Sequence, residues 1–443
     1  MVEPSAIRNN FRKFKMISLI RKFTALYKWA HNYFIVEAHF GSAVSDTFAD
    51  RWSKRLQVLR LPTAVFAVIA SYEEKENLKS GDTVDRPYMT ALFAKTLPST
   101  GAISRHDLTI TGEKLTVDQK KEVSYFVQDY ERIQASIKFT DTAATHVGKV
   151  LINQIDGAVL GEYENADSKI GAYEMAGTGS ASDGIGFTAS ISNVLKVFTT
   201  AKKKLNRLDI PQNDRWAAIS GEFESILLQY LAGKDTNLGD ATGQNGHIGK
   251  FMNFKLYLSN ACAWSGSFLF NAVMGEDDTL VVNGVTFTWN GTIGATEGDC
   301  HILGNATLEA ANAAAALNAP DTSIAGSFIP FTTAAYLKAL EGITASSSDG
   351  TLTLVVEGKG YIAVSDTADD ADSLWDTTKQ IQHQLFGQGR PVDLVIQKFP
   401  KIEVQVRSGY IGRDFITWDL YGLKTFDEGD AQMVDIQTLS GAF

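Results

Sequence analysis

One glycine-rich segment has the spacing of a phosphate-binding loop. Gly179 and Gly184 are separated by four residues, as in loops whose backbone N–H groups hold nucleotide phosphates. Such a loop continues with Lys and then Ser or Thr, whereas this chain continues with Ile185 and Gly186. Because the lysine that contacts the phosphates is missing, we predict a structural loop.

The side chains that commonly bind metals are scattered. Cys300 and His301 are adjacent, but they have no partners at the intervals of a zinc site. Two acidic clusters, within residues 276–278 and 369–372, lack the glycine and the spacing of a calcium loop. We therefore predict solvated acidic surfaces, no metal site and no cofactor.

Nucleophilic catalysis has no recognisable motif either. The chain contains neither the Gly-x-Ser-x-Gly turn of α/β-hydrolases nor a His-Glu-x-x-His zinc-protease motif. His146 lies beside the apolar stripe of a predicted helix, which favours a packing role. We expect no catalytic, cofactor-binding or metal-binding residue and no enzyme, with a hydrolase as the last alternative.

Composition indicates a folded protein of several domains. The 443 residues are 44% hydrophobic and 21% charged, and they include two cysteines, Cys262 and Cys300. Two cysteines provide no disulfide framework and are compatible with a reducing compartment. No apolar run approaches the roughly 20 residues needed to span a bilayer, so we expect no membrane partner.

The net charge of −10 is distributed unevenly. Residues 1–60 contain eleven basic and four acidic residues, whereas residues 265–378 contain two basic and fifteen acidic residues. Such a division predicts that the two segments meet different surroundings. Aromatic and aliphatic residues recur every three or four positions over residues 11–27, which predicts a basic amphipathic helix. Packing on its own domain or a neighbouring copy is favoured for that helix, with membrane or DNA contact as alternatives.

Residues 58–135 are predicted to be rich in strands. The apolar run at residues 65–69, residues 108–110 and residues 123–127 are the expected strands. Residues 89–117 lack a strong core pattern and carry turn signals. This combination predicts a long hairpin with a weakly hydrophobic tip.

Two long helices are predicted in the middle of the chain. The first covers residues 140–165, with Asp141 as its N-cap and an apolar stripe of Ala144, Val147, Leu151, Ile155 and Ala158, widened by Val150, Ile152 and Val159. The second runs from Thr188 to Leu208 with Ile191, Val194, Leu195, Phe198 and Leu205 facing inward. We expect the strand 216–219, the helix 221–231 and the strand 254–258 to follow.

Residues 265–378 have the composition of an inserted α+β domain. Asn283 and Gly284 separate two strand-like runs, 279–282 and 285–289, which predicts a tight hairpin. Helices are expected at residues 307–318 and 333–340, and a second pair of strands at 351–356 and 361–364. Strands at 392–396, 402–406 and 415–426 then resume the earlier pattern, so the main body is discontinuous in sequence.

The order of these parts resembles the major capsid proteins of tailed bacteriophages, which have the Hong Kong 97-type fold. The resemblance rests on five sequence segments: residues 81–87 (GDTVDRP), 121–127 (KEVSYFV), 143–161, 245–260 and 421–424 (YGLK). Asn253 stands where the family frequently has glycine. The expected fold class is α+β, with an N-terminal arm, an extended loop, a peripheral domain containing the spine helix 140–165, and an axial domain.

The resemblance implies a domain map. Residues 1–57 would form the arm, 58–166 the extended loop and peripheral domain, and 167–264 the first part of the axial domain. Residues 265–378 would be the insertion domain, 379–398 the return to the axial domain, and 399–443 the last peripheral strands.

The function implied is a structural one, without catalysis. The subunit would assemble into hexamers and pentamers of an icosahedral head around dsDNA, in the virion, after assembly in the host bacterial cytoplasm. Scaffold, portal and decoration proteins are the other expected partners. An encapsulin-like cellular nanocompartment and a tail, fibre or carbohydrate-binding protein remain as alternatives.

Overall fold

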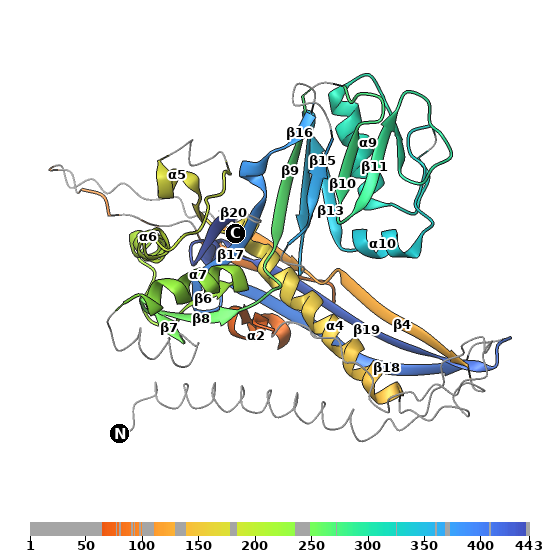
Figure 1. Cartoon of the computed structure of the whole chain (residues 1–443). Helices are drawn as coiled ribbons and strands as arrows, with labels where there is room; N and C mark the ends of the chain where they lie inside the picture. Colours follow the sequence, from red (N-terminus) through yellow and green to blue (C-terminus); the bar gives the residue numbers. More distant parts are fainter. Residues whose placement is uncertain are drawn as a thin grey trace. The chain divides into compact units, whose positions relative to one another are not determined.

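The computed structural model describes residues 64–76, 78, 81–89, 92, 94–96, 99, 110–128, 139–177, 184–234, 249–271, 273–324, 326–358, 361–367, 373–406 and 409–439 (Figure 1). The chain divides into two compact units. One comprises residues 1–61, 118–152 and 396–421, and the other residues 62–117, 153–395 and 422–443. The predicted arm, residues 1–57, lies outside the described residues, and so does its amphipathic helix.

The first unit is built on long antiparallel strands. β4 (Gln119–Gln128) pairs with β19 (Gly412–Thr425), which lies between β4 and β18 (Val392–Val406). The two strands predicted at 392–396 and 402–406 are parts of the single strand β18, so the predicted break between them was wrong. Among the described residues, β1 (Ala70–Ser71) pairs with Val392 and Asp393, the first two residues of β18.

The predicted long helix is α4 (Phe139–Gly161), followed by the 3-10 turn η2 (Glu162–Asn165). It begins two residues before Asp141, so that residue is not the N-cap. The core stripe is confirmed, with Val147, Leu151, Ile155, Ala158 and Val159 buried. Val150 is exposed and Ile152 half-buried, so the stripe is narrower than predicted.

A ten-stranded mixed sheet forms the second unit, in the order β13-β14-β9-β17-β6-β8-β7 with β16, β20 and β5 off this path. Its strands are β5 (Ser168–Ile170), β6 (Arg215–Ile219), β7 (Lys250–Phe251), β8 (Phe254–Leu258), β9 (Trp264–Phe270), β13 (Ile343–Ser348), β14 (Thr351–Val356), β16 (Ser373–Trp375), β17 (Ile381–Gln388) and β20 (Met433–Leu439). β17 is central and pairs antiparallel with β20, β6 and β9. The sequence predicted β6 and β8 almost to the residue.

Two helices share one apolar core with this sheet. α6 (Val194–Arg207) and α7 (Gly221–Ala232) enclose a cluster of phenylalanines in which Phe198 contacts Phe223, Phe251, Phe254 and Phe386. Ser220 is the N-cap of α7 and accepts a hydrogen bond from the N–H of Phe223. The smaller α5 (Ala172–Ala176) precedes them.

The predicted start of α6 at Thr188 was wrong by six residues. The side chain of Asn193 accepts a hydrogen bond from the N–H of Ser190 and donates one to the carbonyl of Thr188. This turn uses the backbone groups that a longer helix would need. Ile191, in this turn, and Leu195, in the first turn of α6, were expected to face inward but are exposed.

The segment 265–378 has its own hydrophobic core. β10 (Thr279–Val282) and β11 (Val285–Asn290) form the predicted hairpin, in which Asn283 has a φ of 51° and Gly284 a φ of 78°. Both central residues therefore have the positive φ of a type I′ turn. The helices α9 (Ala306–Asn318) and α10 (Ala334–Leu340) were also predicted. β11 continues the sheet to β12 (Asp299–His301).

The predicted second strand pair of this segment is wrong. β14 pairs with β13 and β9, whereas β15 (Val364–Asp366) pairs with β10. β13 had no strong strand signal because its sequence, ITASSS, is mostly small and polar. Through β9, the segment also continues the ten-stranded sheet, while its core around Trp264, Phe268 and Trp289 is separate from that around Phe198.

A buried carboxylate joins three segments of the second unit. Asp156 of α4 accepts hydrogen bonds from the N–H groups of Val65 and Phe66, both at 2.7 Å, and from the hydroxyl of Ser259 at 3.2 Å. The apolar run at 65–69 was expected to be a strand, but Phe66–Ile69 forms the short helix α2. This tertiary contact satisfies the first N–H groups of that turn, which local sequence does not reveal.

Replacing Asp156 with Ala should destabilise the subunit. The change leaves two buried N–H groups and a buried hydroxyl without their acceptor, so we expect a loss of about 2–4 kcal/mol in unfolding free energy. Denaturant titration of the soluble subunit measures this loss. Asp156→Asn keeps one acceptor oxygen and should cost less. Equal stability of wild type and Asp156→Ala would contradict the role given to this carboxylate.

Candidate assembly surfaces

A two-stranded hairpin of the second unit buries little of its own surface. β2 (Thr83–Met89) pairs with β3 (Ile110–Thr116) from Thr83 opposite Thr116 to Met89 opposite Ile110. Side chains on both faces are exposed, and Ile110 is 66% exposed. Since two strands alone are marginal in water, this ribbon requires another surface to cover it.

Arg86 attaches the hairpin to the rest of the second unit. Arg86 donates to Asp393 at 3.0 Å and to Glu428 at 3.2 Å, and its guanidinium lies 5.0 Å from the centre of the Phe426 ring. Burial raises the pKa of Asp393, and the nearby Arg86 opposes that shift. These contacts connect the middle of β2 to β18 and to the residues that follow β19.

Apolar side chains are also exposed where β18 ends and β19 begins. Val404, Val406, Tyr410 and Ile411 are exposed, with Val406 at 79% and Ile411 at 74%. Neighbouring exposed apolar residues of this size are uncommon on a monomer and indicate an interaction surface. We call these four residues the apolar tip.

Both faces of β19 carry apolar side chains, with Phe415 and Tyr421 buried on one of them. Thr417 and Asp419 are buried, whereas Ile416, Trp418 and Leu420 on the opposite face are half-buried. Burial raises the pKa of Asp419 to about 6. Lys398 covers Trp418, with its ammonium 3.2 Å from the ring centre. The apolar side chains of the second face are only half-buried, so that face is suited to being covered by a further surface.

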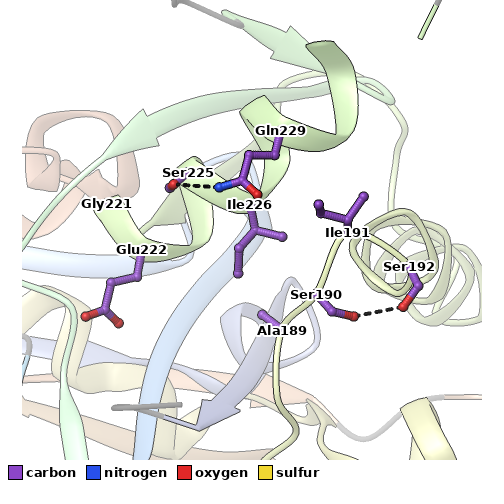
Figure 2. Close-up of a pocket in the computed structure, with 9 residues that line it drawn as sticks. All are labelled: Ala189, Ser190, Ile191, Ser192, Gly221, Glu222, Ser225, Ile226 and Gln229. Carbon is purple, nitrogen blue, oxygen red and sulfur yellow. Dashed lines mark hydrogen bonds between the residues drawn. The ribbon is translucent and has the colours of Figure 1, made fainter. Parts of the chain in front are cut away.

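A shallow groove lies between α7 and the segment Ala189–Ser192 (Figure 2). Ile191 and Ile226 line it from the two sides, and its polar residues are Glu222, the serines and Gln229. Burial raises the pKa of Glu222. The lining combines an apolar floor with one carboxylate, and no catalytic base faces a nucleophile in it.

The described residues provide no metal or membrane site. Their His, Cys, Asp and Glu side chains form no group of three able to hold an ion, and none of their helices is suited to crossing a bilayer. Cys262 and Cys300 are buried, and burial raises the pKa of the Cys262 thiol to about 12. His301, predicted beside Cys300 without metal partners, contacts the carbonyl of Gly291 instead.

The structure does bring together three residues that sequence reasoning missed. Ser265 Oγ lies 2.8 Å from His383 Nε2, and His383 Nδ1 lies 2.9 Å from Asp435 Oδ2. The residues come from β9, β17 and β20, and Ser265 is half-buried while the other two are buried. Gln437 donates to Asp435, and Tyr163 stacks on the imidazole at 3.6 Å.

Ser265, His383 and Asp435 are hydrogen-bonded in the sequence serine, histidine and carboxylate, as in a catalytic triad. Their position inside the sheet is instead that of a structural hydrogen-bond network. All three side chains project from strands of one sheet, and the set connects both ends of the 265–378 segment to the C-terminal strand. A buried polar side chain needs a hydrogen-bond partner, and His383 provides one both to Ser265 and to Asp435. The residues are 118 and 52 positions apart, so no local motif could have revealed them.

Solved structures show the fold. No family model and no curated protein matches the chain. A chain of Mycobacterium phage Che8 is 14% identical with a TM-score of 0.53, over 89% of this chain and 98% of that one. A chain from the capsid structure of cyanophage P-SCSP1u is 11% identical with a TM-score of 0.50, over 90% and 95%. The chain therefore has a phage capsid fold.

Replacing His383 with Ala should cost about 3 kcal/mol of unfolding free energy, because it leaves Asp435 buried beside an empty space and removes the stacking on Tyr163. Ser265→Ala removes one hydrogen bond of a half-buried hydroxyl and should cost about 1 kcal/mol. Thermal and denaturant unfolding measure both. A fluorophosphonate reagent should leave Ser265 unmodified; stoichiometric modification that requires His383 would show a reactive serine instead.

Proposed function

We propose that the chain is the major capsid protein of a tailed bacteriophage, a structural subunit that assembles into the head shell. The observation that carries the proposal is the likeness of the fold, over about nine tenths of the chain, to a chain of a cyanophage capsid. Fold alone does not define function, so the exposed surfaces supply the second argument.

Those surfaces need neighbours. The β2–β3 hairpin, the apolar tip and the outer face of β19 leave apolar side chains accessible that a single subunit does not cover. They are different surfaces, so one copy would contact another through unlike patches. Heterologous contacts of this kind generate rings and closed shells, which supports assembly into hexamers and pentamers.

The domain map implied by the sequence is part of this proposal. α4 would be the spine helix, and β2 and β3 would belong to the extended loop. Residues 167–264 and 379–398, which include β5, β6, β8, β17, α6 and α7, would form the axial domain of a Hong Kong 97-type subunit. The segment 265–378 would be an insertion domain. In this arrangement the described residues bind no cofactor, and the chain acts through contacts and not through catalysis.

Charge supports an orientation in the shell. Residues 1–60 carry a net charge of +7 and residues 265–378 a net charge of −13. An acidic segment is repelled by packaged dsDNA, whereas a basic one is attracted to phosphates. We place the acidic segment on the outside of the virion and the arm inside, after assembly in the host cytoplasm with scaffold, portal and decoration proteins as partners.

A charge at the apolar tip should block assembly without unfolding the subunit. Ile411→Asp places a carboxylate on a surface that we expect to be buried between copies, so the yield of shells should fall at least tenfold. Leu308→Asp, at an exposed leucine of α9, is the matched control and should assemble normally. Electron microscopy and sedimentation measure shell yield; normal shells from Ile411→Asp would argue against the tip as a contact.

Labelling of an introduced cysteine can test whether the acidic segment, residues 265–378, lies on the outside of the particle. Tyr336 is exposed, and both native cysteines are buried, so Tyr336→Cys should be the reactive thiol among the described residues. A maleimide carried on a polymer too large to enter the shell should label intact particles, and the unsubstituted protein should stay unlabelled. Labelling only after the particles are disrupted would place the segment inside.

A further inference from the structure

The last turns of α4 carry two glycines, and a turn from the 265–378 segment lies against them. A Cβ atom built on Gly157 would lie 2.7 Å from the backbone nitrogen of Gly358 and 2.8 Å from its Cα. A Cβ atom on Gly161 would lie 2.8 Å from Oε1 of Glu357. Real Cβ atoms do not approach backbone this closely, so glycine at position 157 is required by the contact.

The turn is shaped for this approach. Gly358 has a φ of 76°, a conformation that other residues rarely adopt. Asn153, one turn before Gly157, donates from Nδ2 to the carbonyl of Gly358 at 3.4 Å. β14 ends at Val356, directly before the turn, and the strand is fixed in the sheet by β13 and β9. The turn is therefore presented to α4 from a rigid base.

The part of α4 that the turn contacts is the part that is fully buried, and Val65, Phe66 and Ser259 contribute to that burial through Asp156. Residues 155–160 are all buried, so every face of this part of the helix is covered. A helix at the surface of a domain normally leaves one face in water. Residues 149 and 150 of the same helix are exposed, and a Cβ atom on the nearby Gly148 would meet nothing within 4 Å.

We propose that the turn Glu357–Gly358 is an internal strap, by which the 265–378 segment holds the last turns of α4 in place. The segment would then serve the subunit's own stability, and the shell would depend on it through α4. Loosening the strap should release residues 155–160 to solvent without disturbing the separate core around Trp289. The effect on the shell rests on the proposed function, whereas the strap itself concerns the single subunit.

Two alanine substitutions on one helix test the strap. Alanine is the better helix former, so Gly148→Ala should raise the melting temperature of the subunit slightly, by about 2 °C. Gly157→Ala has the same helix propensity gain but forces Gly358 away, so the melting temperature should fall by about 5–10 °C. Amide exchange of residues 155–160 should become at least tenfold faster in Gly157→Ala, with exchange in β10 and β11 unchanged.

The subunit measurements separate this proposal from the proposed function. If Gly157→Ala behaves as Gly148→Ala does, in both melting and exchange, the strap is refuted whether or not the chain forms shells. If Gly157→Ala is insoluble, Gly161→Ala takes its place, because its neighbour is the flexible end of Glu357 and the effect should be smaller but of the same sign. Unchanged exchange of residues 155–160 in that variant would refute the strap as well.

Discussion

Apolar surface that the subunit does not cover is the constraint on which the account depends. The β2–β3 hairpin has side chains in water on both faces, and the apolar tip exposes Val406 and Ile411 almost completely. Burial of such groups is worth about 25 cal/mol for each Å² removed from water, and the described residues leave these groups exposed. Arg86, in the middle of β2, forms ion pairs with Asp393 and Glu428 that connect the hairpin to the rest of the second unit.

The interior of the second unit meets the opposite requirement, since its buried polar groups must be satisfied within the subunit. Asp156 accepts from two backbone N–H groups and a hydroxyl, and Asp435 is paired with His383 and Gln437. Both networks join segments that are distant in sequence. They fix the C-terminal part of α4 and the ends of the 265–378 segment within the second unit.

Sequence reasoning succeeded where local chemistry decides the structure. Asn283 and Gly284 determine their hairpin because both positions require a positive φ. The helices predicted at 307–318 and 221–231 lie within one residue of α9 and α7, whose N-caps, Asn305 and Ser220, were not used in that prediction. Sequence reasoning failed where a residue distant in sequence determines the local structure. The apolar run at 65–69 forms α2, and its first N–H groups are bound by Asp156. The start of α6 was misplaced because Asn193 closes a turn that competes with the helix.

The same distinction explains the missed network and the mispaired strands. Ser265, His383 and Asp435 lie together because β9, β17 and β20 are neighbours in the sheet. The local sequences of these three strands do not indicate the order of the strands. The pairing of β15 with β10 likewise depends on the tertiary fold. The resemblance to capsid proteins supplied the global plan that local patterns lacked, and the likeness to solved phage structures confirms a capsid fold.

The central claim is that this chain builds a shell by contacts with copies of itself. Electron cryomicroscopy of the purified full chain, with sedimentation of the same sample, tests it most directly. The account predicts closed icosahedral particles in which rings of five and six copies are joined through the hairpin and the apolar tip. A stable monomer at high concentration, with the β2–β3 hairpin folded back on its own subunit, would contradict it.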